Sequence, residues 1–142
     1  MNEDLAQILT DAKTIAIIGC SVDPYRTSHH IGQYLKEQGY QIIPVNPEYE
    51  EVLEEKCYDN VTDIPSEVQI DVVDIFRNSR YTAQMIDTII ERAEVTGHKP
   101  VIWTQLGVSS REAKEKAESA GFTYIEERCM MVDHRRLIGQ NQ

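Results

Sequence analysis

Residues 15–35, with the sequence IAIIGCSVDPYRTSHHIGQYL, contain the signal that decides the fold. The apolar and mostly β-branched residues 14–19 predict a strand that is buried on both faces of a parallel sheet. A helical pattern then resumes, with Thr27 or Ser28 as its expected cap and Gly39 at its end. A loop between a first strand and a first helix is where nucleotide-binding folds approach the phosphates of a ligand.

The alternation of strands and helices continues along the rest of the chain. Further strands are predicted at 41–46, 70–76, 100–107 and 122–126. Helices are expected between them, and Ser109 and Glu112 have the spacing of a capping box for the last one. We therefore expect the α/β class, with a three-layer, Rossmann-like, doubly wound sheet of about five mainly parallel strands and helices on both faces. No linker or repeat divides the sequence, so residues 1–142 predict a single domain.

Composition excludes several classes of partner. The 142 residues carry a net charge of −10 at pH 7 with no long basic run, so nucleic acid is not an expected partner. The three cysteines are far apart and lack metal-ligand spacing, which predicts no metal site and a reducing compartment. Neither a secretory leader nor an apolar stretch long enough to cross a bilayer is present, so we expect a cytoplasmic protein without membrane attachment.

The first loop, residues 19–28, departs from the dinucleotide-binding pattern. That pattern needs glycines where this chain has Ser21 and Pro24. It also needs an acid at the end of the second strand, where this chain has Asn46. Both departures disfavour NAD. The loop still offers hydroxyl donors, the guanidinium of Arg26 and a helix start, which suit a different phosphate ligand. The alternative is that these residues form only a turn and a helix cap.

Four separated segments, at 17–65, 71–79, 103–108 and 127–137, resemble in the same order the small stand-alone CoA-binding proteins. The domain of those proteins is similar to the CoA-binding domain of the succinyl-CoA synthetase alpha subunit. The resemblance implies a Rossmann-like CoA-binding fold with CoA or an acyl-CoA as the ligand. The 3′-phosphate and diphosphate of CoA also suit cations and hydroxyl donors better than the ribose-binding acid of an NAD site.

The resemblance also implies a set of cofactor-binding residues, all of which follow predicted strands. The loop that binds the phosphates would contain Gly19, Ser21, Arg26 and Ser28. The nucleotide part of the ligand would be bordered by Asn46 and Pro47, and the same crevice would be faced by Phe76 and Arg77. The far side, along the pantetheine arm, would be lined by Gln105, Leu106 and Gly107. Two alternatives stay open from the residues alone. For Arg77 the alternative to ligand binding is a surface ion pair, and for Phe76 it is a place in the hydrophobic core.

No catalytic constellation is evident in the sequence. Ser21 lacks the second glycine of a nucleophile elbow, and Cys129 is expected to be a buried, inert thiol. In succinyl-CoA synthetase, which this chain resembles in part, the chemistry depends on a phosphorylated histidine from a second domain that these residues do not contain. We therefore expect binding without turnover. The alternatives are an enzyme that uses NAD or acyl-CoA, or a partner-binding module with an empty crevice; a homo-oligomer is compatible with each.

Overall fold

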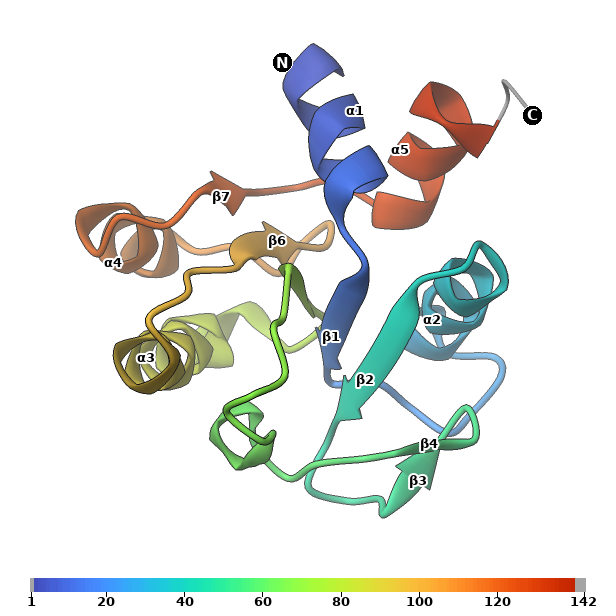
Figure 1. Ribbon diagram of the computed structural model, residues 1–142, viewed down its shortest axis with the longest axis horizontal. Coiled ribbons are helices and arrows are strands. Elements are labelled where there is room, and N and C mark those ends of the chain that lie inside the picture. The colour runs from blue at the N-terminus through green and yellow to red at the C-terminus, as the bar shows by residue number, and fades with distance from the viewer. Residues whose placement is uncertain (1, 140–142) are drawn as a thin grey trace.

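The computed structural model describes residues 2–139 and has a central parallel sheet between two layers of helices (Figure 1). The elements in chain order are α1 (Asn2–Asp11), β1 (Thr14–Ile18), α2 (Thr27–Glu37), β2 (Gln41–Val45), β3 (Glu51–Val52), β4 (Glu55–Lys56), the 3₁₀ turn η1 (Val61–Asp63), β5 (Val72–Ile75), α3 (Ser79–Thr96), β6 (Val101–Thr104), α4 (Arg111–Ser119), β7 (Tyr124–Ile125) and α5 (Met130–Leu137). Five strands pair in the order β2-β1-β5-β6-β7, all parallel. This confirms the predicted fold class.

The sheet separates two hydrophobic clusters. One face is covered by α3 and α4, which contribute side chains such as Ile86 and Ala113. The other face is covered by α1, α2 and α5, with Leu9, Ile31 and Met130 among the buried residues. Every residue of β1 is buried because this strand has a neighbour on each side and helices on both faces. Its uninterrupted apolar sequence is therefore the expected pattern for its place in the sheet.

The chain reverses its direction of travel across the sheet between β1 and β5. It moves from β1 to the edge strand β2 and then crosses back to β5 on the other side of β1. The loops that leave β1 and β5 therefore diverge, one toward α2 on one face and the other toward α3 on the opposite face. Such a divergence leaves a crevice at the carboxyl ends of the strands, where ligands of doubly wound folds bind.

Two local expectations were wrong. The cap of α4 is Ser110, whose Oγ accepts a hydrogen bond from the Ala113 N–H, so the cap lies one residue after the predicted one. Cys129 was expected to be buried, but it is only partly buried at the start of α5. Two short elements were not predicted: the β3-β4 hairpin in the acidic stretch after β2, and α5, which packs against α1 and α2.

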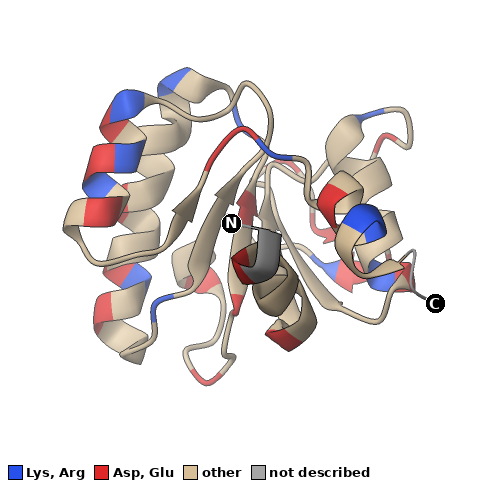
Figure 2. Ribbon diagram, turned by 90° about the horizontal axis from the view of Figure 1, so that it is seen from above, with Lys and Arg blue, Asp and Glu red and all other residues tan. Residues whose placement is uncertain are grey.

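Charged side chains gather on the helices. Figure 2 shows acidic and basic residues interleaved on α3 and α4 at the left, and Lys116 of α4 pairs with Asp87 of α3 at 2.9 Å. No helix within residues 2–139 combines the length and apolar character needed to cross a bilayer.

One carboxyl group, that of Asp74, lies inside the central strand β5. Its side chain is 0% exposed, and neither carboxyl oxygen has a hydrogen-bond partner among the described residues. Its partners in the sheet register are Ile17 on β1 and Trp103 on β6, both fully buried. Burial therefore raises the pKa of Asp74 well above its ordinary value, because an ionised carboxylate is poorly solvated there.

We expect Asp74→Asn to raise the free energy of unfolding at pH 7, because the amide does not titrate and each unit by which burial raises the Asp74 pKa costs the wild type about 1.4 kcal/mol there. Because its pKa is raised, Asp74 keeps its proton in the folded protein up to a higher pH than in the unfolded chain. The contribution of Asp74 to the stability of the wild type is therefore greatest below the ordinary carboxyl pKa of about 3.9 and falls as the pH rises toward the raised pKa. Denaturant unfolding between about pH 4 and 8 should show the gain of the variant shrinking at the acid end.

Asp71→Asn provides a control of opposite sign. Burial alone would raise the pKa of Asp71, but the N–H groups of Lys13 and Thr14, which donate to its Oδ2 at 2.9 and 3.0 Å, lower it overall. Its replacement should therefore reduce stability at neutral pH. A pH-independent loss of stability in Asp74→Asn would show that Asp74 is not held as a neutral acid.

Candidate functional site

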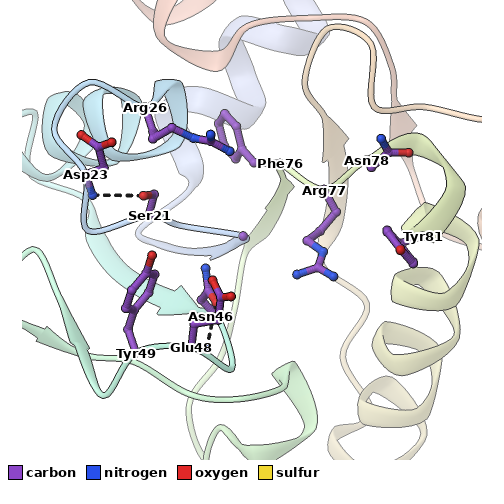
Figure 3. A pocket seen from close by; sticks show the side chains of 11 residues that line it. Ser21, Asp23, Arg26, Asn46, Glu48, Tyr49, Phe76, Arg77, Asn78 and Tyr81 are labelled. Atoms are coloured by element: carbon purple, nitrogen blue, oxygen red, sulfur yellow. Dashed lines mark hydrogen bonds between the residues drawn. The ribbon is translucent and has the colours of Figure 1, made fainter.

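The crevice at the carboxyl ends of β1, β2 and β5 contains a cavity of about 440 Å³ (Figure 3). Its lining residues come from the loops that follow these three strands and from the first turn of α3. They are Gly19, Ser21, Asp23, Arg26, Asn46, Glu48, Tyr49, Phe76, Arg77, Asn78 and Tyr81. The cavity therefore occupies the position that the strand order predicts for a ligand.

Hydrogen bonds within the first loop hold it in shape. The Ser21 N–H donates to Oγ of Ser28 at 3.0 Å, and the Asp23 N–H donates to Oγ of Ser21 at 3.0 Å. Oδ1 of Asp23 accepts from the Tyr25 N–H at 2.9 Å. Part of the loop is therefore a hydrogen-bonded turn. The expected cap was wrong, because the N-cap residue of α2 is Arg26 and Ser28 bonds back to the loop instead.

The start of α2 is left without a side-chain cap. The N-cap residue Arg26 accepts no capping hydrogen bond, whereas Asn78 and Ser110 cap α3 and α4. Thr27 and Ser28 in the first turn of α2 line a smaller cavity of about 260 Å³, and Gly19 and Arg26 line both cavities. An uncapped helix start presents free N–H groups and a positive dipole end, which together stabilise an anion.

Two arginines face the cavity without carboxylate partners. Figure 3 shows Arg26 on the α2 side and Arg77 on the side of β5 and α3. Within the described residues neither guanidinium forms an ion pair, so the surface ion pair considered for Arg77 is absent there. Arg77 instead lies over the ring of Tyr81, with its Cζ 5.3 Å from the ring centre. Both cations are therefore available to an anionic ligand.

Asn46 connects the first two loops. Its Nδ2 donates to the Cys20 carbonyl at 3.2 Å, and its Oδ1 accepts from the Glu48 N–H at 3.0 Å. The side chain lines the cavity, but its amide nitrogen and its amide oxygen already form these two hydrogen bonds. Asn46 therefore positions the loops around the cavity.

The remaining predicted residues are distributed unevenly around the site. Phe76 is partly buried and lines both cavities, so it belongs to the cavity wall and to the edge of the core. Pro47 lines a third, mainly apolar cavity of about 310 Å³ that shares Gly19 and Arg77 with the first. Gln105, Leu106 and Gly107 follow β6, on the far side of β5 from β1, and are not in the lining of these three cavities.

Five residues of the cavity lining were not predicted from the sequence. These are Asp23, Glu48, Tyr49, Asn78 and Tyr81. Glu48 and Tyr49 lie three and four residues beyond the end of β2, Asn78 is the N-cap of α3, and Tyr81 lies in its first turn. Their positions just after strand ends were the available signal, because the carboxyl ends of parallel strands meet at one edge.

The nucleophilic groups near the cavity are not arranged as a catalytic pair. His29 Nδ1 lies 2.8 Å from the Ser21 carbonyl oxygen, so this nitrogen carries the proton and does not contact the Ser21 hydroxyl. Cys20 is fully buried, and burial raises the pKa of its thiol to about 12. Burial also raises the pKa of Cys57. Both thiols therefore stay protonated at neutral pH.

Comparison with known proteins identifies the family. A family model described as a CoA binding domain matches residues 13–135. The chain belongs to this family. The expected resemblance to CoA-binding proteins is thereby confirmed.

Relatives of this CoA-binding chain include proteins of similar and of greater length. The uncharacterized protein YneT of Bacillus subtilis is 34% identical over 131 residues and 92% of each chain. Subunit alpha of the ADP-forming acetate–CoA ligase II of Pyrococcus furiosus is 33% identical over 128 residues, which are 89% of this chain but 26% of that subunit. A hypothetical protein of Pyrococcus horikoshii has the same fold, with a TM-score of 0.90 and 43% identity over 98% of this chain and 93% of that one.

Proposed function

We propose that this chain binds CoA or an acyl-CoA, with the ligand's diphosphate at the loop between β1 and α2, and does not convert it. One observation carries the proposal: Arg26 and Arg77, without ion pairs within residues 2–139, face a cavity at the uncapped start of α2. Two guanidinium groups and free helix N–H groups match the charge and acceptor oxygens of a diphosphate. Membership of the CoA binding domain family supports CoA over other diphosphates.

Binding without turnover is supported by the state of the nearby nucleophiles. The Ser21 hydroxyl accepts a hydrogen bond within its own loop, and the imidazole of His29 is bound to a carbonyl oxygen. Neither group is activated by the other. A homo-oligomer that covers the edge strands stays a prediction.

Isothermal titration of ligand-free protein with CoA, pantetheine and ADP tests the proposal. We expect CoA to bind with measurable heat and pantetheine to give none, because pantetheine lacks the diphosphate. ADP should bind more weakly than CoA but detectably. A folded protein that binds pantetheine as well as CoA, or binds neither, would refute a diphosphate site at the first loop.

A second assay addresses turnover. Purified protein incubated with acetyl-CoA should release no free thiol above the buffer rate. Steady thiol release that copurifies with the protein would contradict the non-catalytic part of the proposal while leaving binding intact.

A further inference from the structure

The edge of the sheet continues from the main cavity toward the start of α5. Parallel pairing extends one residue beyond β5 and β6, because the Phe76 N–H donates to the Ile18 carbonyl at 2.9 Å and the Gln105 N–H donates to the Ile75 carbonyl at 3.3 Å. Phe76 and Gln105 are therefore neighbours at this edge. Phe76 lines two cavities beside the first loop, so Gln105 lies one strand spacing, about 4.8 Å, further from that loop.

Gln105 carries a buried acceptor without a partner. Its side chain is 8% exposed, and its Oε1 has no hydrogen-bond partner among the described residues. Because side chains alternate along a strand, Gln105 projects from the same face as Trp103, the face covered by α1, α2 and α5. An unpartnered buried amide oxygen is costly, and an N–H donor of a ligand would satisfy it. The pantetheine arm of CoA has two amide N–H groups.

The side chain of Cys129 lies on this same face, next to the end of β6. Nε1 of Trp103 donates to the Arg128 carbonyl at 3.0 Å, and the Arg128 N–H donates to the Thr104 carbonyl at 3.3 Å. These two bonds hold the residue before Cys129 against the strand end from which Gln105 projects. Cys129 packs at the border of the hydrophobic cluster that contains Trp103.

Cys129 differs from the other two cysteines of the chain. Cys20 and Cys57 are buried, whereas Cys129 is only partly buried. Cys129 is also the N-cap residue of α5, and its side chain forms no capping hydrogen bond. An uncapped helix start stabilises negative charge, and the thiolate is the form of a cysteine that attacks a disulfide. Of the three thiols, Cys129 is therefore the one placed to react with a ligand.

The starts of α2 and α5 are within reach of a single CoA molecule. Both helices cover the same face of the sheet and contact each other. From β1 to β6 the sheet spans two strand spacings, about 10 Å. The pantetheine arm is a chain of about 12 bonds, which extends to about 14 Å. With its diphosphate at the start of α2, CoA can therefore cross Phe76 and Gln105 and bring its sulfur to Cys129.

We propose that Cys129 is a thiol–disulfide exchange site for CoA disulfide, with Gln105 accepting a hydrogen bond from an amide of the pantetheine arm. The Cys129 thiol loses its proton to water, and the thiolate attacks the sulfur of the bound CoA moiety. The S–S bond of CoA disulfide breaks as the bond to Cys129 forms. The second CoA leaves as a thiolate and takes up a proton, so Cys129 is oxidised and the departing CoA is reduced.

This inference rests on the proposed function, because it takes the diphosphate to lie at the first loop. It concerns the disulfide form of CoA alone. The thiol and the thioesters of CoA stay bound without conversion.

Intact mass of the reduced protein, followed over time with CoA disulfide, tests the inference. We expect the mass of one CoA moiety to be added, to be removed by dithiothreitol, and to map to Cys129. Pantethine, the disulfide of pantetheine, lacks the diphosphate and should react at least about tenfold more slowly, because binding raises the effective concentration of the disulfide. The double variant Arg26→Ala, Arg77→Ala should react with CoA disulfide as slowly as with pantethine.

Three single variants complete the test. Cys129→Ser should abolish the addition. Gln105→Ala should slow it about threefold to tenfold, the effect of one lost hydrogen bond. Cys57→Ser is the matched control and should keep the wild-type rate, because a serine hydroxyl can replace the bond from Cys57 Sγ to the Asn46 carbonyl at 3.4 Å.

Titration with CoA separates failure of the inference from failure of the proposed function. A protein that binds CoA but gains no CoA moiety, gains it on another cysteine, or reacts equally fast with pantethine would overturn the inference and preserve the proposed function. Folded protein that binds no CoA would overturn both.

Discussion

Replacement of both Arg26 and Arg77 by alanine is expected to weaken CoA binding about 100-fold or more. A hydrogen bond between charged groups contributes about 1.5 to 3 kcal/mol, and two such contacts to the diphosphate would be lost. Since about 1.4 kcal/mol corresponds to a factor of ten, the combined loss exceeds two orders of magnitude. Titration of the double variant with CoA measures this effect. The fold should survive, because within the described residues neither guanidinium has an ion pair.

Two further variants sharpen this experiment. Replacement of both residues by lysine keeps the charges but removes the planar fork, so an intermediate loss of affinity is expected. Arg111→Ala removes an equally cationic side chain on α4, where Arg111 pairs with Glu115 at 3.2 Å, and should leave affinity unchanged. Wild-type affinity in the double alanine variant would show that the diphosphate binds elsewhere.

Gly19→Ala should lower the free energy of unfolding by about 2 to 4 kcal/mol. Gly19 has φ +86°, in the left-handed region that residues with a side chain rarely adopt. An added Cβ would also lie 2.9 Å from the Phe76 carbonyl oxygen and 3.3 Å from Cδ of Arg77. The Gly19 N–H donates to the Val45 carbonyl at 2.8 Å, so the residue lies where the ends of β1, β2 and β5 meet. Thermal unfolding should show a midpoint lowered by about 10 °C.

Gly39→Ala separates the two causes of this loss. Gly39 also has a positive φ, +101°, but an added Cβ would have no atom within 4 Å. Its replacement reports backbone strain alone, of about 1 to 2 kcal/mol. The excess loss in Gly19→Ala then measures the close approach of β1 and β5. Equal losses in the two variants would contradict a steric role for Gly19 at the crevice.

The sequence pattern predicted the parts of the fold that depend on local periodicity. The buried apolar run of β1 and the alternation of strands and helices were sufficient for a doubly wound α/β fold. The position of the main cavity at the strand ends agrees with the same topology, and six of the predicted residues line it: Gly19, Ser21, Arg26, Asn46, Phe76 and Arg77. The segments that resemble CoA-binding proteins also indicated the correct family.

Residues outside the regular elements were predicted less well. Helix caps and short hairpins depend on loop geometry, so Ser28 was expected to cap α2 and instead anchors Ser21. The segment that forms α5 has little pattern of its own, and it is helical where it packs against α1 and α2.

By itself, the sequence determined the fold class and the family, and it predicted the first loop as the region of the site. These follow from residue types and spacings within short segments. Only the tertiary structure decided that Asn46 joins two loops while Glu48 keeps a free carboxylate at the cavity wall, and that Gln105 lies beyond the cavity. The physical reason is that strand order and hydrogen bonds bring together residues that are far apart in the chain. A local sequence pattern does not predict which of those side chains already form hydrogen bonds with one another.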